Sequence, residues 1–551
     1  MSRRPARTVA GPDSESAPVQ HEVLIVGAGF GGIGVGIGLQ KIGIHDFVIL
    51  EQADGVGGTW RDNSYPGLEV DVPSFSYSYM FEPKADWSQL YAPGSEVQAY
   101  AEHCADKFGL RRHIRFGRQV IQARFDEANA LWRVSLQTGE ELTARYLVNA
   151  CGYLSGPRLP EIDGIDAFAG KIMHTARWDH DYDLTGKRVA IIGTGATGIQ
   201  VAPAIVDKVA HLDVYQRTAI WLAPKINPPI SRRAQRVMRR APVLQRAARA
   251  YIWFVSELFF RVAFQNHRRY HRVTEAVERF LIKSMRKKVD DPATQEKLIP
   301  NYSFFCKRPS FSNTFYPMFN RDNVDLVTDG ITHVTERGLA TVGGAEREAD
   351  VLVCATGFHV FDRSSAPMFE IIGEGDTNLR DWWDENRYQA YLGTTVPQFP
   401  NLFLIFGPYA ASGSSYFDIL NNQVVHIGRV LRAAKKRASN YAVVRPEVHE
   451  RDFAKVQRKA QKMVLYSGDC ATSNTYYFDG KGDSPAAPRP SSMLGLWLTT
   501  RLFRLDNYRF ELRTGRPVHT DHASQERTGA ASAGTRSVVG SEAPILHTEL
   551  S

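Results

Sequence analysis

Two glycine-rich segments share the spacing GxGxxG, and each follows a short apolar run. The first copy comprises Gly27, Gly29 and Gly32, and the second occupies residues 193–198. At a turn from a buried strand into a helix, glycines let the backbone approach a pyrophosphate, and the helix N-terminus attracts its negative charge. One such pattern often marks an ordinary turn. Two copies in the same context predict two bound dinucleotides.

The two copies differ in the charged residue that lies 24 positions after their first glycine. The first copy reaches Glu51 and the second reaches Arg217. A carboxylate at this place accepts hydrogen bonds from a ribose 2′-hydroxyl, whereas an arginine suits a 2′-phosphate. We therefore predict FAD at the first copy and NADPH at the second. The alternative for Arg217 alone is an ordinary solvated cation.

The bulk composition is that of a soluble globular protein. The chain has 551 residues, 43% hydrophobic and 23% charged residues, and a net charge of +8. This length suits about two or three domains. No nucleic-acid-binding module accompanies the positive charge, so no nucleic-acid partner is predicted. No stretch reaches about 18 uninterrupted apolar residues, so no transmembrane span is predicted. The oligomeric state stays open.

The cysteines are scattered along the chain and odd in number. They are Cys104, Cys151, Cys306, Cys354 and Cys470. The absence of a CxxC pair argues against a zinc ribbon and against a flavin-disulfide reductase, whose chemistry needs paired thiols. We predict no metal site. This cysteine usage favours a reducing, cytoplasmic compartment.

The elements that must position the glycine loops come from distant parts of the sequence. Buried strands are expected at 23–26, 47–50, 132–136, 146–150, 189–192, 212–215, 351–357 and 402–408, the last two each ending in a turn. A nucleotide-binding domain whose strands are separated in this way has the other domain inserted into it. The pattern predicts an α/β fold with two Rossmann-like dinucleotide-binding domains, for FAD and NADPH, and an inserted helical subdomain. The expected boundaries are a disordered tail at 1–20, the FAD domain at 21–156 and 371–514, the NADPH domain at 157–228 and 301–370, the helical insertion at 229–300, and a disordered tail at 515–551.

The helical insertion contains a conspicuously apolar stretch. Residues 251–255 and 258–260 are almost all apolar or aromatic, and several arginines follow them. The plain interpretation is a helix packed on the body of the protein. The alternatives are a hydrophobic entrance for a substrate or a contact with a membrane surface.

Between the two glycine loops, residues 168–179 read FAGKIMHTARWD. This segment resembles the FxGxxxHxxxW(P/D) fingerprint of type I Baeyer–Villiger monooxygenases at every fixed position. Three further segments resemble that family, namely GGTW…YPG…D within 57–71, CKRP…FNRDNV within 306–324, and ATGF at 355–358. The family's domain order extends the resemblance to about residue 510.

The resemblance implies an enzyme with FAD and NADPH as cofactors and a ketone and O₂ as substrates. In that family NADPH reduces FAD, and O₂ adds to the flavin as a C4a-peroxide that converts the ketone into an ester or lactone. One alternative is an N- or S-oxygenase of related fold. Another is a sensor that binds both nucleotides without catalysis.

The resemblance also implies roles for four catalytic or coupling residues. Arg308, in the CKRP segment, is expected to stabilise negative charge next to the flavin. Asp71 is expected to orient Arg308 through a charge-assisted hydrogen bond. His174 and Trp178 are expected to couple the nicotinamide position to domain movement rather than to act as acid or base. A linker histidine with an ordinary structural role is the alternative for His174.

Cofactor contacts carry over in the same way. Residues expected around FAD are Gly27, Gly29, Gly32, Glu51, Thr59, Trp60, Asp71, Tyr77 and, through its backbone, Val120. Residues expected along the NADPH pyrophosphate are Thr194, Gly195, Thr197, Gly198 and Gln200, and those at its 2′-phosphate are Arg217, Thr218 and Lys307. The segments 409–413 and 473–479 are expected to border the substrate pocket, and their aromatic and small residues favour a bulky apolar ketone.

Overall fold

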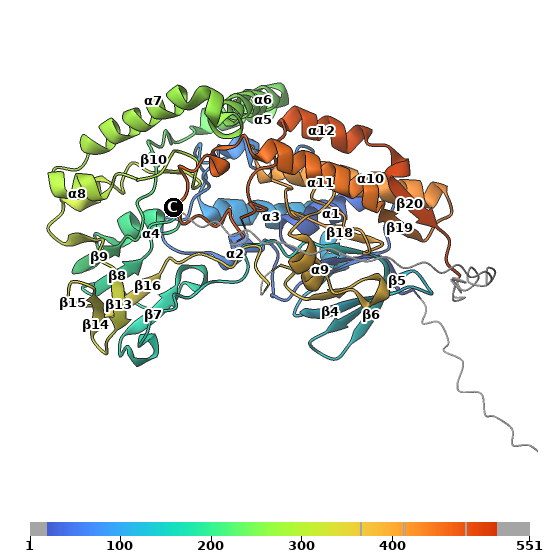
Figure 1. Cartoon of the computed structure of the whole chain (residues 1–551), viewed down its shortest axis with the longest axis horizontal. Helices are drawn as coiled ribbons and strands as arrows, with labels where there is room; N and C mark the ends of the chain where they lie inside the picture. The colour runs from blue at the N-terminus through green and yellow to red at the C-terminus, as the bar shows by residue number, and fades with distance from the viewer. Residues whose placement is uncertain (1–18, 364–365, 412, 414, 480–481, 515–551) are drawn as a thin grey trace, which may run out of the picture.

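The structure is a computed structural model that describes residues 19–363, 366–411, 413, 415–479 and 482–514 (Figure 1). The tails expected at 1–20 and 515–551 lie outside these residues, apart from positions 19 and 20. Position 412 of the expected pocket loop lies outside them as well.

The first sheet has eight strands, and a glycine loop leaves its centre. Its order is β17 (Glu370–Ile372), β4 (Val120–Asp126), β5 (Leu131–Leu136), β6 (Glu141–Asn149), β1 (His21–Val26), β2 (Phe47–Leu50) and β3 (Ile114–Arg115), with β18 (Leu402–Leu404) also paired to β6. β1 runs parallel to both neighbours, and Val26 lies opposite Leu50 and Asn149. The residues that follow these three strand ends therefore meet at one edge of the sheet, which is where α/β folds bind ligands.

The second sheet repeats this arrangement with five parallel strands. Its order is β12 (Val324–Val327), β9 (His211–Tyr215), β8 (Arg188–Ile192), β16 (Val351–Cys354) and β7 (Lys171–His174). Ile192, at the end of β8, lies opposite Tyr215 and Cys354. The second glycine loop therefore also starts at the carboxyl edge of a sheet.

Each sheet draws its strands from both halves of the chain. β17 and β18 join the first sheet, whereas β12 and β16, which precede them in sequence, join the second. Two Rossmann-like sheets with interleaved chains and a helical insertion confirm the predicted fold class. The eight predicted strands are also observed, each with its ends shifted by a few residues at most.

Alternate residues of the central strands face different cores, because successive side chains of a strand point to opposite faces. Leu24 and Val26 belong to one apolar cluster, and Val23 and Ile25 belong to another. Apolar clusters therefore cover both faces of the first sheet. This burial on two sides explains why its parallel strands are continuous apolar runs in the sequence.

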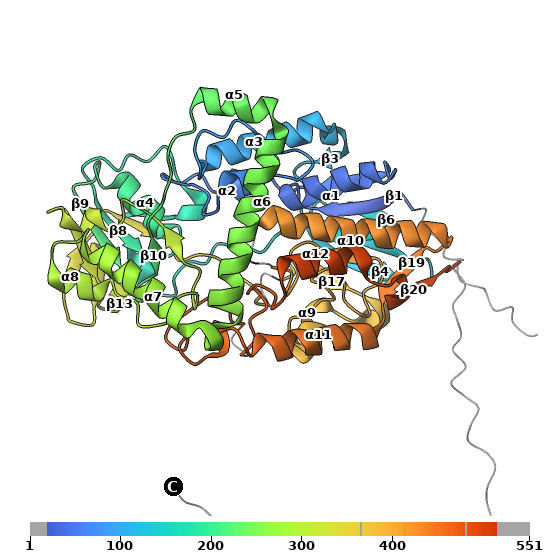
Figure 2. The same cartoon turned by 90° about the horizontal axis from the view of Figure 1, so that it is seen from above.

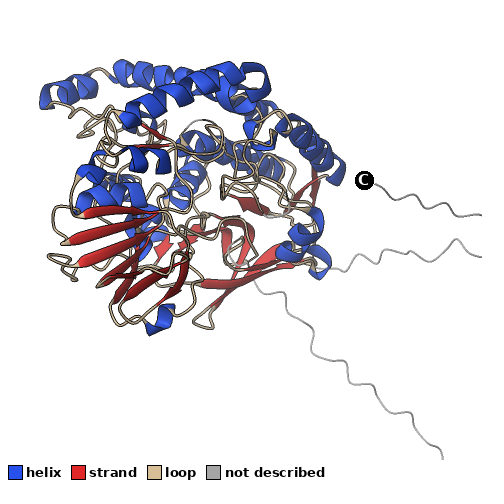
Figure 3. Cartoon of the chain, turned by 60° about the vertical axis from the view of Figure 1, so that its left-hand side comes forward, coloured by secondary structure: helices blue, strands red, loops and turns tan. Residues whose placement is uncertain are grey.

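Helices surround the sheets and form a layer above them (Figures 1 and 3). α1 (Phe30–Lys41) and α4 (Gly198–Ile205) follow the glycine loops, and the insertion consists of α5 (Arg232–Arg240), α6 (Pro242–Phe259), the π-helical turn η5 (Phe260–Gln265), α7 (His267–Arg286) and α8 (Pro292–Lys297). The helices of the insertion lie within the segment 229–300 that was predicted as helical. The other α-helices are α2 (Thr59–Asp62), α3 (Gly94–Lys107), α9 (Leu379–Asn386), α10 (Tyr416–Lys436), α11 (Pro446–Ala460) and α12 (Met493–Leu502). Within the described part of the chain, no helix has the length and apolarity that crossing a membrane requires.

Short strands complete the fold. They are β10 (Leu222–Ala223) with β11 (Ser310–Phe311), β13 (Ile331–Val334) with β14 (Gly338–Thr341) and β15 (Glu346–Glu348), and β19 (Tyr441–Val444) with β20 (Tyr508–Glu511). The β10–β11 pair fixes the chain directly after the predicted CKRP segment, because Ser310 donates its backbone N–H to the Trp221 carbonyl at 3.1 Å.

Cys306 and Cys470 form a disulfide across a sequence separation of 164. The bond joins the residue before Lys307 to the loop between α11 and α12. This pair was not predicted from the sequence, because only the fold brings its two members together. The disulfide removes the cysteine-based argument for a reducing compartment, and a cytoplasmic location stays a prediction.

We expect the Cys470→Ser variant to unfold at a lower temperature than the unmodified protein. A covalent link between distant positions restricts the unfolded chain, and losing it costs about 2–5 kcal/mol of unfolding free energy. Thermal unfolding with and without dithiothreitol measures the effect. The reductant should lower the midpoint of the unmodified protein and leave that of Cys470→Ser unchanged. Equal midpoints for both proteins under both conditions would contradict the assignment.

Candidate active site

The two glycine loops share the same backbone geometry. Gly27 and Gly193 have φ values of +103° and +108°, in the left-handed region that favours glycine. A Cβ atom at Gly27 would lie 2.8 Å from the Ala150 carbonyl oxygen, and one at Gly193 would lie 2.7 Å from the Ala355 carbonyl oxygen. Each first glycine therefore lets its loop pass directly over the neighbouring strand end.

The other glycines of the motif also have physical roles. A Cβ atom at Gly32 would lie 1.9 Å from the Gly27 carbonyl oxygen, and one at Gly198 would lie 2.2 Å from that of Gly193. These third glycines let each helix approach its own strand. At Gly195 nothing lies within 4 Å of the added atom. The space beside that loop can therefore accept a phosphate group.

Glu51 links the end of β2 to the first glycine loop. Its side chain is buried, and its two carboxylate oxygens accept the backbone N–H groups of Ala28 at 2.7 Å and Ala53 at 2.9 Å. Each oxygen retains a lone pair that can accept a ribose hydroxyl. The Glu51 carbonyl accepts the Arg118 N–H, which brings the backbone leading to Val120 beside the same strand end.

The structure also brings together four residues predicted around FAD. Gly29 lies against Gly58, whose Cα is 3.6 Å from a Cβ atom added at Gly29, and Thr59 begins α2 directly after it. Trp60 donates its indole N–H to the Tyr77 hydroxyl at 3.0 Å. The GGTW segment thus closes over the first glycine loop.

Two cations lie close together beside the second loop. Burial and the neighbouring positive charge of Arg217 lower the pKa of Lys307 to about 8. Among the described residues neither cation forms an ion pair with a carboxylate. Thr218 accepts a hydrogen bond from the Asn474 side chain at 3.1 Å, which adds the C-terminal segment to this corner. Adjacent cations without acidic partners fit a phosphate.

Helix α4 joins the second loop to the YPG segment. Gln200, in its first turn, accepts a hydrogen bond from the Tyr65 hydroxyl at 3.0 Å and donates one to the Glu69 carbonyl at 3.0 Å. The side chain of Gln200 therefore points toward the segment that leads to Asp71. Thr194 and Thr197 precede the helix in the loop, and Thr194 is buried.

Asp71 and Arg308 form a bidentate ion pair. The Arg308 Nε donates to Asp71 Oδ2 at 2.7 Å, and Nη2 donates to Oδ1 at 2.8 Å. The charge of Asp71 raises the pKa of Arg308 well above its ordinary value, so the guanidinium keeps its proton. Two parallel bonds fix the plane of the guanidinium and leave Nη1 on the side away from Asp71. The Arg308 side chain is 46% exposed, which makes that side accessible.

Tyrosines surround Arg308. Tyr476, Tyr477 and Tyr153 interact electrostatically with its guanidinium. Tyr476 and Tyr477 belong to the segment that was expected to border the pocket, whereas Tyr153 was missed. Tyr153 stacks on Phe406, whose ring centroid is 4.7 Å away. Its signal in the sequence is its position just after the strand expected at 146–150, at the carboxyl edge of the sheet.

His174 and Trp178 lie apart from this ion pair, and neither bonds to Arg308 in the described structure. His174 ends β7, is buried, and accepts the Ala176 N–H with Nδ1 at 3.1 Å. Its Nε2 is buried. Burial lowers the pKa of His174, so the imidazole is neutral at pH 7. Trp178 ends the 3₁₀ turn that follows and packs against the core of the second sheet.

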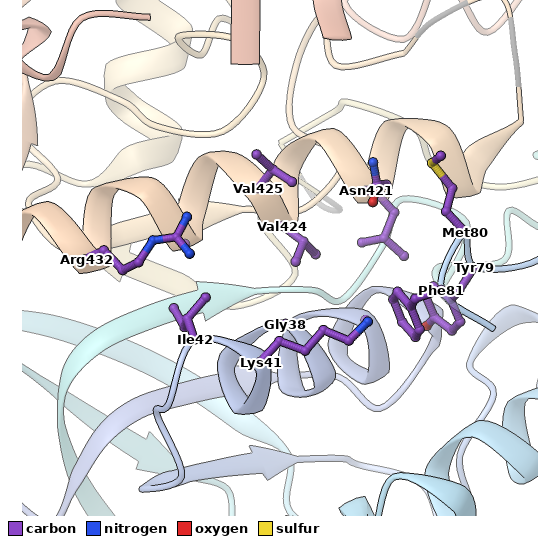
Figure 4. Close-up of a pocket in the computed structure, with 13 residues that line it drawn as sticks. Gly38, Lys41, Ile42, Tyr79, Met80, Phe81, Asn421, Val424, Val425 and Arg432 are labelled. Atoms are coloured by element: carbon purple, nitrogen blue, oxygen red, sulfur yellow. The ribbon is translucent and has the colours of Figure 1, made fainter. Parts of the chain in front are cut away.

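A separate groove of about 340 Å³ lies between α1 and α10 (Figure 4). Its wall includes Gly38 and Val424, and Lys41 extends along it with Nζ 3.4 Å from the centre of the Phe81 ring. None of the residues predicted to bind a cofactor or to act in catalysis lines this groove.

Comparison with known proteins agrees with this geometry. Residues 24–258, which contain both glycine loops, match a family model described as pyridine nucleotide-disulphide oxidoreductase. This chain has no CxxC pair.

Two relatives are Baeyer–Villiger monooxygenases. The protein of Streptomyces coelicolor is 36% identical over 526 residues, which cover 95% of this chain and 97% of the relative. That of Pseudomonas aeruginosa is 38% identical over 459 residues, which cover 82% and 85%. The crystal structure of OTEMO in complex with FAD and NADP superposes with a TM-score of 0.80 at 28% identity, over 90% of this chain and 100% of that one. This chain belongs to the Baeyer–Villiger monooxygenase family.

Proposed function

We propose that the chain uses FAD, NADPH and O₂ to convert a ketone into an ester or lactone. The observation that carries this proposal is the bidentate Asp71–Arg308 pair, with the two glycine loops at the carboxyl edges of their sheets. FAD, when bound, supplies the redox centre that takes a hydride from NADPH and activates O₂. The protein supplies the positions and charges around it.

We assign FAD to the first loop. Gly27, Gly29 and Gly32 would admit its pyrophosphate, and Glu51 would accept its ribose hydroxyls. The remaining residues that we assign to FAD are Thr59, Trp60, Asp71, Tyr77 and the backbone of Val120. We assign residues 21–156 and 371–514 to the FAD domain, 157–228 and 301–370 to the NADPH domain, and 229–300 to the helical insertion.

We assign NADPH to the second loop, with Thr194, Gly195, Thr197, Gly198 and Gln200 along its pyrophosphate. Arg217, Thr218 and Lys307 would bind its 2′-phosphate. Lys307 and Arg217, which form no ion pair with a carboxylate among the described residues and interact electrostatically with each other, support this assignment. NADH lacks that phosphate, so the enzyme should prefer NADPH.

Arg308 would stabilise the negative charge that develops on oxygen during the reaction. A fixed cation in a partly enclosed site lowers the free energy of such states without reorganising. The Arg308 guanidinium stays protonated throughout, so it stabilises charge without consuming it by proton transfer. Asp71 acts as a positioning residue that holds the guanidinium plane.

His174 and Trp178 would position the nicotinamide. The neutral state of His174 and its bond to the Ala176 N–H fit a positioning role better than acid–base catalysis. The alternative of an N- or S-oxygenase would yield an N-oxide or sulfoxide as main product, so product analysis separates it from ketone oxidation.

We expect the Arg308→Ala variant still to oxidise NADPH but to form ester at least about 100-fold more slowly. The loss of one preorganised group that stabilises developing charge typically slows an enzyme by this factor. Parallel assays of NADPH consumption and ester yield measure this split. Arg504→Ala is the control, because this exposed arginine forms its ion pair with neighbouring Asp506. An unchanged ester yield from Arg308→Ala would remove Arg308 from the mechanism.

We expect Arg217→Ala to raise the KM for NADPH by roughly 10- to 100-fold, the value of one lost charge-assisted hydrogen bond. The KM for NADH should hardly change, because NADH has no 2′-phosphate. Steady-state kinetics with both cofactors test the assignment. Equal effects on the two KM values would show that Arg217 does not bind the 2′-phosphate.

The preference for NADPH should decline as the pH rises through about 8. Below this pKa Lys307 is protonated and attracts the 2′-phosphate, and above it the free enzyme loses that charge. The ratio of the KM values for NADPH and NADH isolates this effect from the pH dependence of later steps. Lys307→Arg should make the ratio independent of pH between 7 and 9, because arginine stays charged. A flat ratio in the unmodified enzyme would contradict the assignment.

A further inference from the structure

Exposed apolar side chains are concentrated on one set of helices. Fifteen of the 23 exposed large hydrophobic residues among those described lie on α5, α6, α7 and α12. They are Val237, Val243, Leu244, Tyr251, Phe254, Val255, Leu258, Phe259, Tyr270, Val273, Phe280, Leu494, Trp497, Leu498 and Leu502. We call these four helices, together with η5, the helical face. Contiguous exposed apolar surface of this kind marks an interaction site.

Helix α6 carries the longest apolar stripe. Tyr251, Phe254, Val255 and Leu258 are 70%, 60%, 44% and 56% exposed. Their spacing of three and four residues places them on one side of the helix. Gln245 is the only buried residue of α6. The stripe is therefore turned away from the body of the protein.

Helix α12 extends this apolar surface beside α6. The backbone N–H of Met493 donates to Glu257 at 2.9 Å, and Gln265 donates to the Ser491 carbonyl at 2.9 Å. Leu494, Trp497 and Leu498 are exposed on α12. Both views place α5, α6, α7 and α12 on the same side of the molecule (Figures 1 and 2).

The helical insertion on this face has a large excess of positive charge. Residues 231–290 contain 16 Lys and Arg and four Asp and Glu, which gives this segment a net charge of +12. The whole chain has a net charge of +8, so the remainder is negative. The charge is therefore concentrated where the apolar side chains are exposed.

We propose that the helical face docks onto a membrane surface that carries anionic lipids. Aromatic and aliphatic side chains would enter the boundary between headgroups and acyl chains, and the arginines would interact with the lipid phosphates. A second copy of this chain is the poorer occupant, because a symmetric contact would oppose two segments that each have an excess of positive charge. The helices would lie along the membrane plane, since α6 exposes an apolar stripe and arginines flank it in sequence.

The docked face would lie next to the proposed site of oxidation. The Phe259 ring lies 5.2 Å from that of Phe305, three positions before Arg308. An apolar ketone dissolved in the membrane would therefore be close to the active site of a docked enzyme. This last step depends on the proposed function, whereas docking itself does not.

Flotation of the intact enzyme with lipid vesicles tests the proposal. We expect binding to vesicles of 70% phosphatidylcholine and 30% phosphatidylglycerol, and little binding to pure phosphatidylcholine. Raising the salt concentration from 50 mM to 500 mM should release the protein, because salt screens exposed charges. These comparisons of vesicle composition and salt concentration need no variant and do not depend on catalytic turnover.

Two sets of substitutions test the two components of the face. Tyr251→Ser/Phe254→Ser/Leu258→Ser should abolish flotation, and Arg232→Gln/Arg233→Gln/Arg236→Gln should weaken it by roughly 100-fold. Matched controls are Ile121→Ser/Val342→Ser and Arg337→Gln/Arg363→Gln, which are exposed outside this face and should leave flotation unchanged. Unfolding midpoints confirm that the variants are folded.

Three outcomes would overturn the proposal. One is the absence of flotation with anionic vesicles at low salt. Another is equal flotation of the control and test variants. The third is a stable dimer in solution that the Tyr251→Ser/Phe254→Ser/Leu258→Ser variant separates, since the face would then be a subunit interface. Failure of ketone oxidation with normal flotation would concern the proposed function and leave docking intact.

Discussion

The ion pair between Asp71 and Arg308 depends on the placement of both sheets. Asp71 lies in the segment that follows the first glycine loop. Arg308 lies after the helical insertion, 237 positions beyond Asp71 in the sequence. Two parallel hydrogen bonds of 2.7 and 2.8 Å tolerate little displacement of either partner. The chain must therefore bring the carboxyl edges of two separate sheets toward one point before Arg308, the proposed catalytic cation, is oriented. Short β-pairing at Ser310 and the Cys306–Cys470 bond fix the Arg308 side of this arrangement.

The YPG segment links the two proposed nucleotide sites through a few polar contacts. Gln200, on the helix that follows the second loop, bonds both Tyr65 and the Glu69 carbonyl, and Asp71 lies two residues beyond. A movement of α4 on nucleotide binding would therefore act on the backbone that carries Asp71. Such a movement would pass from one rigid element, helix α4, to another, the short hydrogen-bonded turn of the YPG segment.

The sequence predicted what depends on local patterns. Glycines with positive φ and apolar runs that form strands reflect neighbours within a few residues. Glu51 and Arg217 each lie 24 positions after the first glycine of their loop, so a fixed spacing identified them. The Cys306–Cys470 pair and the stacking of Tyr153 on Phe406 depend on long-range packing, which leaves no periodic signal. The stripe on α6 is an intermediate case. Its helical spacing was visible, but a stripe that packs inward and one that faces outward have the same periodicity, so only burial in the folded chain distinguishes them.

The bond between Cys306 and Cys470 also gives part of the chain a closed topology. Together with the backbone between them it forms a covalent ring that carries Arg308 on one side and includes α9, α10 and α11. A protease that cuts once inside this ring would open it without separating the fragments. Arg308 and the loop with Tyr476 would remain on one covalently joined molecule, and the cut would become visible as two bands only after thiol reduction.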